Sequence, residues 1–528
     1  MRLAILFLLL LPLTAALVSV PGARAAPGPV VQQIASDGFT NPQSQHATQV
    51  EPDSFAYGNT IVTAFQSGRY VSLGGASGIG FATSLDGGVT WSQGTLPRLT
   101  VDSSPPGTRT RVTDPSVAYD AAHGTWLVSS LGLSEPCGTD CQTSLLVSRS
   151  ADGLTWSDPV TIAAPIGSFA HDKNWTVCDN GTASPRRGTC YTSFSDFTNG
   201  RRIVTSRTTN GGVSWSSPVG SPDPGATGLG AQPVVRPDGR LVVVFLAGNS
   251  ESAIGSISSA DGGASFGTMT AIPGVGRYPN QFAPGPILPR SPLRGRSLPS
   301  VEVNADGVIY AAWDDCRFSS GCSANDIVLA TSADGTSWSA PARIPIDAPG
   351  SGVDHVVPGL GVDVTSAGSG TRLALTYHTL PAACTPSSLS SCQLRVGFVS
   401  SLDGGSTWSA PLELSTTPMP LSWLPDTSQG RMVGDYVSTS FVPGGAAVAV
   451  FPLARAAVSG FDQAVHAARI QLVAPPAPPP APSPSPSPEP AAGTIVPPPA
   501  PVDPTPARAG ATLRRVIVDT VRVTPSRR

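Results

Sequence analysis

Charged and aromatic side chains able to bind an anion or move a proton gather at a few points of this chain. Each point lies just before a stretch whose residues alternate like a β-strand. Guanidinium groups hold carboxylates in bidentate geometry, and carboxylic acids transfer protons. Because only 13% of the 528 residues are charged, this clustering is the best signal of a site. The stretches are 111–114, 171–175, 296–299, 354–355 and 431–436, with 195–196, 314–317 and 377–378 in later loops.

Six copies of a short turn motif indicate which elements position these residues. Each copy reads Ser/Thr-x-Asp/Asn-Gly, mostly with a second Gly, and then x-Ser/Thr-Trp/Phe. The acidic or amide side chain should accept backbone N–H bonds of its own turn, and the glycine should supply a positive φ. Two copies, at Asp152 and Asp334, lack the second glycine, which predicts turns one residue tighter. The copies are 84–91, 150–156, 208–215, 259–266, 332–338 and 401–408.

The spacing of the motif predicts an all-β fold, a β-propeller. The intervals from Asp86 to Asp403 average about 63 residues, which suits one four-stranded blade per repeat. Strand alternation predicts an entry strand, a second and a third strand, the motif turn, and a fourth strand. In the first repeat these are 54–58, 60–66, 79–83 and 91–96.

The end of the repeat region bears on the number of blades. After the sixth motif, 435–442, 446–452 and 464–473 predict three more strands, and 30–34 could supply a fourth. Seven blades are therefore favoured. Six blades are the alternative, with these end segments folded over an existing blade.

The order of strands also separates two rims. The motif turns must lie on one of them, the motif rim. The entry strands begin on the opposite one, the entry rim, where the second-to-third loops also lie. We therefore expect function at the entry rim.

The six motifs resemble the Asp-box repeats of the sialidase (neuraminidase) superfamily, across about residues 45–473. The resemblance implies arginines that bind the carboxylate of an acidic sugar, a carboxylic acid that transfers a proton, and a tyrosine nucleophile. The positions that would fill these roles are Arg111, Arg296 and Arg431 for the sugar carboxylate, Asp114 or Asp172 as proton donor, Tyr436 as nucleophile and Glu302 as its base, with Arg317 and Trp175 in substrate binding.

Two departures from that family stand in the sequence. Its Arg-Ile-Pro motif near the first blade has no counterpart, because Arg343-Ile344-Pro345 falls in a predicted fourth strand after the fifth motif. Sialidases also have six blades, whereas this chain favours seven.

Two functions therefore compete. The first is a secreted sialidase-like glycoside hydrolase that acts on terminal acidic sugars of glycans. The alternative is a non-catalytic propeller that binds glycans or proteins at the cell surface; a pure scaffold comes third. We expect a glycan or glycoprotein partner and a monomer. The net charge of −3 argues against a nucleic-acid or anionic-membrane partner.

No cofactor is expected, although the loop at Asp314 and Asp315 could bind a structural Ca²⁺ through its oxygens. The eight cysteines form four close pairs, which argues for local disulfides rather than a zinc site. The predicted pairs are Cys137/Cys141, Cys178/Cys190, Cys316/Cys322 and Cys384/Cys392.

The ends of the chain differ from its middle. Residues 1–25 have the pattern of a secretory signal peptide, and no second apolar stretch is long enough to span a membrane. The propeller is expected over 30–473, followed by a proline-rich linker over 474–508. A short basic tail, 509–528, either contacts an anionic cell wall or is a frayed end.

Overall fold

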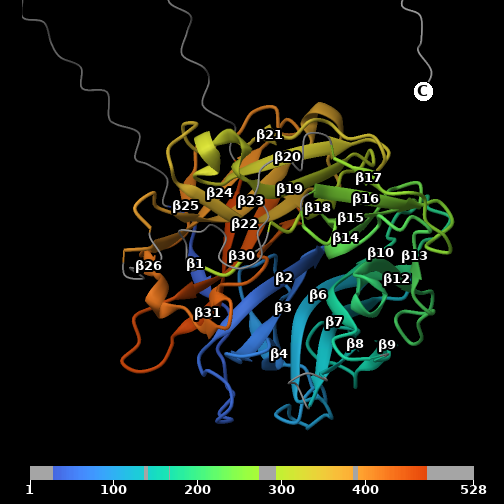
Figure 1. Cartoon of the computed structure of the whole chain (residues 1–528), viewed down its shortest axis with the longest axis horizontal. Helices are drawn as coiled ribbons and strands as arrows, with labels where there is room; N and C mark the ends of the chain where they lie inside the picture. Colours follow the sequence, from blue (N-terminus) through green and yellow to red (C-terminus); the bar gives the residue numbers. More distant parts are fainter. Residues whose placement is uncertain are drawn as a thin grey trace, which may run out of the picture. The chain divides into compact units, whose positions relative to one another are not determined.

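The computed structural model describes residues 28–135, 141–165, 167–251, 253–272, 293–295, 297–384 and 391–472. The chain divides into two compact units, 1–476 and 477–528. The second unit lies outside the described residues, as do the predicted signal peptide, linker and basic tail. Strands dominate the described part of the first unit, which is all-β as predicted (Figure 1).

Most of the described strands can be assigned to seven consecutive groups of four, antiparallel within each group, and a short pairing joins the first two groups into one eight-stranded sheet. The first two groups are β2 (Gln49–Tyr57), β3 (Thr60–Arg69), β4 (Ala76–Ser84), β5 (Ser92–Thr95) and β6 (Arg111–Asp120), β7 (Thr125–Ser134), β8 (Gln142–Ser150), β9 (Val160–Ala163). The next two are β10 (His171–Cys178), β11 (Cys190–Asp196), β12 (Arg202–Thr208), β13 (Val219–Gly220) and β14 (Gly228–Val235), β15 (Leu241–Ala247), β16 (Ala253–Ser259), β17 (Thr270–Ala271). The fifth and sixth are β18 (Ser300–Val303), β19 (Ile309–Asp315), β20 (Asp326–Ser332), β21 (Ala342–Arg343) and β22 (Asp354–Val362), β23 (Leu373–Leu380), β24 (Gln393–Ser401), β25 (Leu412–Glu413).

Short elements complete the described part. β26 (Met419–Pro420) pairs with β24, and β27 (Asp426–Thr427) pairs with β28 (Gly430–Arg431). None of the helical elements in the described ranges has the length and apolarity of a membrane-crossing segment. They are 3-10 turns at Phe197–Asn199, Cys316–Phe318, Ser320–Cys322, Gly368–Gly370 and Leu421–Trp423.

The last group joins the two ends of the described chain. It consists of β29 (Ser438–Val442), β30 (Ala446–Ala454), β31 (Gln463–Gln471) and the N-terminal β1 (Val31–Gln33). β1 lies against β31, with Val31 opposite Ala468. The prediction that the N-terminal segment supplies the fourth strand here is therefore confirmed.

The first strand of each group contacts the first strand of the next, and the circuit closes where β29 contacts β2. A repeated hydrogen bond accompanies this contact: a backbone N–H of one first strand donates to a side chain of its neighbour. The pairs are Val117 to Asp53 (2.7 Å), Thr176 to Ser116 (3.0 Å), Val301 to Gln232 (2.6 Å), Leu360 to Ser300 (2.9 Å) and Ser54 to Ser438 (3.0 Å). This closed circuit of antiparallel sheets is consistent with a β-propeller-like fold.

The hydrophobic core lies between neighbouring groups. Central strands such as β15 and β30 are buried along their whole length. Their sequences are nearly continuous apolar runs, as expected for strands covered on both faces. Between the fourth and fifth groups, for example, Val242 and Val244 of β15 pack in one cluster with Trp313 of β19.

Each motif turn connects the third and fourth strands of its group and has the predicted hydrogen bonds. In the first copy, Asp86 Oδ1 accepts from the backbone N–H groups of Val89 (3.0 Å) and Thr90 (2.9 Å). Asp86 Oδ2 accepts from the Thr90 hydroxyl at 2.6 Å. The shorter copy at Asp152 bonds to residues two and three positions on instead of three and four, so its turn is one residue tighter as predicted.

The motif turns also bind the preceding group, which the sequence did not indicate. A glycine carbonyl of the turn accepts a hydrogen bond from a side chain of the neighbouring sheet, so the turns fasten sheet to sheet. The donor and acceptor pairs are Thr83 and Gly153 (2.5 Å), Arg149 and Gly211 (2.7 Å), Arg207 and Gly262 (2.8 Å), and Ser256 and Gly335 (2.9 Å).

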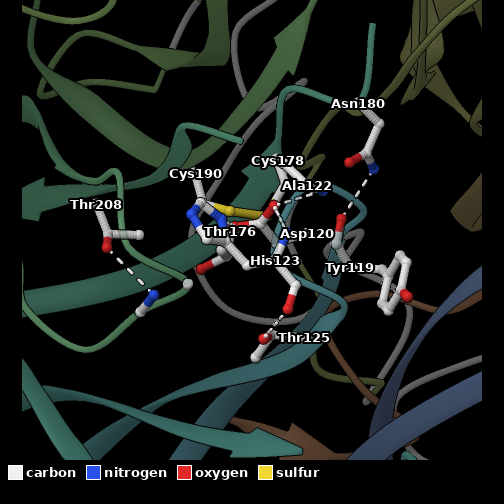
Figure 2. Close-up of a disulfide and its surroundings, with 12 residues drawn as sticks. Tyr119, Asp120, Ala122, His123, Thr125, Thr176, Cys178, Asn180, Cys190 and Thr208 are labelled. Atoms are coloured by element: carbon white, nitrogen blue, oxygen red, sulfur yellow. Dashed lines mark hydrogen bonds and ion pairs between the residues drawn. A yellow bond between two sulfur atoms is a disulfide. The ribbon is translucent and has the colours of Figure 1, made fainter. Parts of the chain in front are cut away.

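Three of the predicted disulfides lie within the described residues: Cys178–Cys190, Cys316–Cys322 and Cys384–Cys392. Cys141 is also disulfide-bonded, and its predicted partner Cys137 lies outside the described residues. The first bridge joins the end of β10 to the start of β11, beside a turn fixed by Asp120 and His123 (Figure 2). Such bridges are typical of exported proteins.

Candidate functional site

Five first strands share a β-bulge near their beginning, close to the entry rim. At each bulge one residue has a positive φ between 49° and 66°, a backbone conformation that residues other than glycine rarely adopt. The residues are Glu51, Asp114, Lys173, Gly230 and Val357. Three of the five carry a charge, so the bulges aim charged side chains at a common region.

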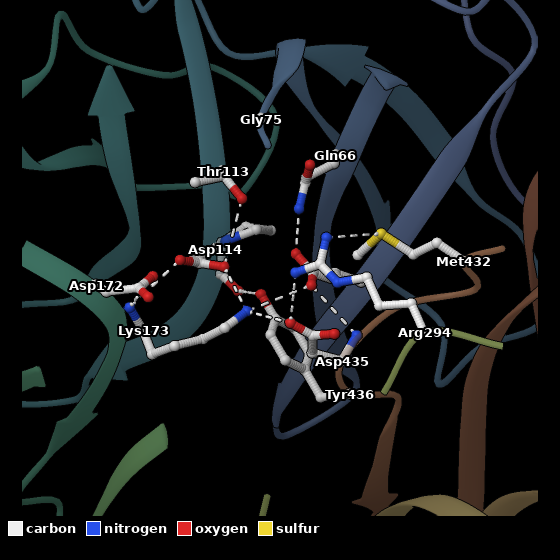
Figure 3. Close-up of polar contacts among 12 residues, drawn as sticks. Gln66, Gly75, Thr113, Asp114, Asp172, Lys173, Arg294, Met432, Asp435 and Tyr436 are labelled. Carbon is white, nitrogen blue, oxygen red and sulfur yellow. Dashed lines mark hydrogen bonds and ion pairs between the residues drawn. The ribbon is translucent and has the colours of Figure 1, made fainter. Parts of the chain in front are cut away.

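Lys173 stands at the middle of that region and is the only lysine in the chain. Its ammonium group lies 2.6 Å from Asp435 Oδ2, 3.0 Å from Asp114 Oδ1 and 3.5 Å from Glu51 Oε1 (Figure 3). Its side chain is only 8% exposed. One buried cation therefore joins three carboxylates from three different groups of strands.

Two buried arginines belong to the same arrangement. Arg294 donates to Asp435 Oδ2 at 2.9 Å, and its side chain reaches the Met432 sulfur (Figure 3). Arg69 donates to the Gly75 carbonyl oxygen at 2.5 Å and to the same sulfur at 3.3 Å. We call the whole set the Lys173 network; it comprises Glu51, Gln66, Arg69, Asp114, Lys173, Arg294 and Asp435.

The network is electrically balanced, with three cations and three carboxylates. Burial opposes the charged form of Lys173, but the Asp114, Asp435 and Glu51 carboxylates outweigh it and hold its pKa well above the usual value. Burial raises the pKa of Glu51, and Lys173 opposes that shift. Burial lowers the pKa of Arg69 to about 10, so its guanidinium stays charged at neutral pH. With all three carboxylates ionised, the network offers no surplus positive charge to an anionic ligand.

A cleft opens above the network at the entry rim. We call it the entry cleft. Its floor holds charged network residues, and Asp172 and His171 stand beside them. Its apolar wall consists of Leu73, Leu131, Leu133, Phe169, Phe197 and Leu229.

A second, narrow hollow, the central cavity, lies deeper between the first strands. Asp114, Lys173 and Asp435 line both hollows, so the network forms the partition between them. Two further carboxyl groups face the central cavity. Burial raises the pKa of Asp53 to about 7, and burial together with the nearby Asp53 charge raises the pKa of Glu302 to about 8.

Tyr436 and Trp175 also line the central cavity. Their rings meet edge to face with centroids 5.1 Å apart, and the Tyr436 hydroxyl donates to the Pro115 carbonyl oxygen at 2.9 Å. Burial, followed by the charges of Glu51 and Asp114, raises the pKa of Tyr436 well above its usual value. The phenol therefore stays protonated at neutral pH.

Of the arginines that the resemblance singled out, Arg111 and Arg431 line neither hollow. Arg111 stacks on the Tyr70 ring at 4.3 Å and donates to the Ser72 carbonyl and to Glu135. Arg431 donates to the Leu424 carbonyl oxygen and pairs with Asp426 at 3.1 Å. Arg296 lies outside the described residues.

The two aspartates that end β19 accept hydrogen bonds from protein donors. Arg317 donates through its Nε to Asp315 Oδ2 at 2.8 Å, and the Trp313 indole donates to the same oxygen at 3.1 Å. Asp314 accepts from the Ser297 hydroxyl at 2.5 Å, and burial raises the Asp314 pKa to about 6. Arg317 therefore holds its own loop.

Of the predicted site residues, Asp114, Asp172, Trp175, Tyr436 and Glu302 line these two hollows. The sequence interpretation assigned no role to the other network members Glu51, Arg69, Arg294 and Asp435. One signal for Glu51 was present: Glu51 precedes Pro52 as Asp114 precedes Pro115, at the same position of successive repeats. The sequence signal for Lys173 was that it is the sole lysine of the chain. Arg69 and Arg294 carry no comparable pattern.

No protein-family model and no curated protein match the chain. The solved structures that resemble it include the phage phi92 endosialidase, at 13% identity and a TM-score of 0.46, over 84% of this chain and 69% of that one. The Hadza microbial sialidase Hz136 has 16% identity and a TM-score of 0.42, over 81% and 68%. A Dyadobacter fermentans protein of unknown function has 14% identity and a TM-score of 0.42, over 85% and 100%. At these identities and TM-scores the likeness carries no argument about activity.

Proposed function

We propose that this chain is a secreted, non-catalytic propeller protein that binds a neutral, hydroxyl-rich glycan in the entry cleft. The observation that carries the proposal is the charge balance of the Lys173 network. Lys173 pairs with all three carboxylates, and Arg294 also pairs with Asp435. A carboxylate ligand would have to displace one of these buried partners, at the cost of an unpaired buried charge.

The make-up of the entry cleft suits a sugar. Sugar hydroxyls both donate and accept hydrogen bonds, and the cleft floor offers guanidinium donors beside carboxylate acceptors. The Phe169 and Phe197 side chains add an apolar wall for the ring faces. Fixed polar groups beside an apolar wall are the usual composition of a small-molecule site.

The same proposal covers the architecture, export and C-terminal segment of the protein. The seven groups of strands are the blades of a propeller, and the six motifs are Asp-boxes that fasten blade to blade. Residues 1–25 direct export, the chain is a monomer, and the segment 474–528 spaces the propeller from a cell surface.

A hydrolase is the second candidate, because Asp114 and Asp172 both line the entry cleft. Glycoside hydrolysis usually needs two carboxyl groups, one to transfer a proton and one to act as base or nucleophile. In this candidate, Asp172 is the proton donor and Asp114 the ionised partner. Tyr436 has no part in it as a nucleophile, since its hydroxyl stays protonated and bound to Pro115.

Two assays on the mature chain separate the candidates. A glycan array and titration calorimetry should detect neutral oligosaccharides bound at micromolar affinity, and fluorogenic sialosides and neutral glycosides should give no turnover. Asp172→Asn should weaken binding about tenfold, the scale of one charged hydrogen bond. Asp238→Asn is the matched control, because Asp238 is an exposed residue of the β14–β15 hairpin that bonds to Arg236 and to the Arg240 backbone N–H, and it does not line the entry cleft.

Turnover that disappears with Asp172→Asn and persists with Asp238→Asn would replace the binding proposal with the hydrolase. Tight binding restricted to acidic glycans would contradict the role given to the balanced network. A chain that neither binds nor hydrolyses any glycan would remove both candidates.

A further inference from the structure

Two carboxylates and an imidazole converge at the entry rim, away from the entry cleft. Asp326 begins β20, Asp347 lies in the connection between β21 and β22, and His355 is the second residue of β22. One ligand atom from each lies within 4.8 Å of the other two. Asp326 is 4% exposed and His355 is 2% exposed, so the three groups meet largely out of contact with solvent.

Arg343 of β21 orients both carboxylates. Its Nε donates to Asp326 Oδ1 at 2.6 Å, and its Nη2 contacts Asp347 Oδ1. Its Nη1 donates to the Asp347 backbone carbonyl oxygen at 2.8 Å. The guanidinium therefore occupies one oxygen of each carboxylate and leaves the other oxygen of each to face elsewhere.

Those two remaining oxygens have no hydrogen-bond partner. Asp326 Oδ2 and Asp347 Oδ2 are both shielded from solvent and unsatisfied. A buried carboxylate oxygen without a partner is unfavourable, because it has lost its water and gained nothing in return. Some further group is needed to satisfy them.

His355 presents a third lone pair at the same place. Its Nδ1 lies 3.3 Å from the Asn325 carbonyl oxygen, which can only accept, so Nδ1 carries the hydrogen. Nε2 then bears the lone pair and lies 3.7 Å from Asp347 Oδ2. A hydrogen bond from the far nitrogen to a backbone carbonyl is the usual way in which metal-binding histidines are oriented.

We propose that Asp326, Asp347 and His355 form a binding site for a divalent transition-metal ion of the zinc type. One imidazole nitrogen and two carboxylate oxygens are ligands that Zn²⁺ accepts, whereas Ca²⁺ prefers six to eight oxygens. The two carboxylates and Arg343 sum to one negative charge, which attracts a cation. Arg343 acts as a positioning residue because it binds the carboxylates from outside.

Such an ion would join two neighbouring groups of strands. Asp326 belongs to the sheet of β18–β21, and His355 belongs to the first strand of the next sheet. The Cys316–Cys322 disulfide lies in the β19–β20 connection, just before Asp326. The ion would fasten the entry rim as the glycine carbonyls of the motif turns fasten the motif rim.

Thermal unfolding with and without metal tests the proposal on the tag-free mature chain after treatment with a chelator. Zinc chloride in excess should raise Tm by about 2–5 °C, since binding to the folded state alone stabilises it. Calorimetry and elemental analysis should give one ion per chain. Calcium chloride should leave Tm unchanged.

Variants locate the ion. His355→Gln and Asp326→Asn should abolish the zinc-dependent shift in Tm, and Asp347→Asn on the more exposed connection should do so with the least effect on folding. His123→Gln is the matched control, because His123 pairs with the carboxylate of Asp120 at 2.6 Å and belongs to no such three-ligand group among the described residues. That variant should keep the full shift.

Three outcomes would overturn the proposal. Zinc that binds nowhere and leaves Tm unchanged is the result expected if a water molecule satisfies the two oxygens. A shift that survives in all three ligand variants would place the ion elsewhere. A shift with calcium and none with zinc would contradict the inferred ligand chemistry.

Discussion

The two rims use the same side-chain types in opposite ways. On the motif rim, Asp86 is exposed, and hydrogen bonds from the Thr90 hydroxyl and backbone lower its pKa to about 2. In the central cavity, burial raises the pKa of Asp53 to about 7 and that of Glu302 to about 8. The turn supplies donors to its own carboxylate, whereas the cavity removes water without supplying enough of them.

The repeats explain why this difference exists. The motif turn is a local solution to a hydrogen-bonding requirement, so almost the same residues recur in all six copies. The bulge in the first strands recurs as well, but its residue changes from Glu51 to Asp114 to Lys173 along the chain. A repeated backbone with changing side chains therefore places unlike charges around one centre. Closure of the circuit then brings Asp435, which precedes β29 of the last group, into contact with Lys173.

Replacement of Lys173 is expected to give the largest effect. Lys173→Met leaves three carboxylates facing one another without their central cation, and loss of one partner of a buried ion pair costs about 3–5 kcal/mol of unfolding free energy. Urea unfolding measures it. The double variant Lys173→Met/Asp114→Asn should lose less than the sum of the two single variants, because the second change removes one of the orphaned charges. A loss below about 1 kcal/mol in the single variant would show that the network is not coupled.

The single lysine also permits a direct measurement of its charge state. Protein made with ¹³C,¹⁵N-lysine should give one side-chain ammonium signal, and that signal should persist above pH 10.5, the ordinary pKa of lysine. The carboxylates around Lys173 are the cause. Titration near the ordinary value would contradict the buried arrangement, and the same protein in urea provides the unperturbed reference.

The carboxyl groups of the central cavity and those of the motif rim should make the free energy of unfolding depend on pH in opposite directions. Asp53 and Glu302 have raised folded-state pKa values, from 3.8 to about 7 and from 4.5 to about 8. The folded state therefore binds more protons than the unfolded state between these values, and the associated stability falls as the pH rises from about 4 to 8. The pKa of Asp86 is lowered on folding from 3.8 to about 2. The stability that Asp86 contributes is therefore lost as the pH falls through that range.

Tm measured from pH 3 to pH 9 tests this contrast. The double variant Asp53→Asn/Glu302→Gln should flatten the alkaline side of the profile and leave the acid side unchanged. Asn at position 53 can still accept from the Val117 N–H group, which keeps the contact between sheets. An alkaline side unchanged in the double variant would assign the dependence to other groups.

The sequence predicted the fold because its signals are local. Turn chemistry and strand alternation act over a few residues, so the strand order, the tighter turns at Asp152 and Asp334 and the pairing of β1 with β31 followed from them. The network could not be predicted in the same way. Arg69 reaches Met432 across 363 residues and Arg294 reaches Asp435 across 141, and no local pattern marks either arginine.

The motif rim should show the smallest and most independent effects. Asp86→Ala removes an acceptor for two backbone N–H groups and two hydroxyls, a change comparable to loss of a helix N-cap, and should cost about 0.5–2 kcal/mol. Val89→Ala at the exposed tip of the same turn is the control and should stay within about 0.5 kcal/mol. Asp261 serves a separate turn, so Asp86→Ala/Asp261→Ala should lose the sum of the two single variants within about 0.5 kcal/mol. Strong coupling between these turns would contradict the idea that each motif satisfies its own hydrogen bonds, and it would make the motif rim resemble the Lys173 network.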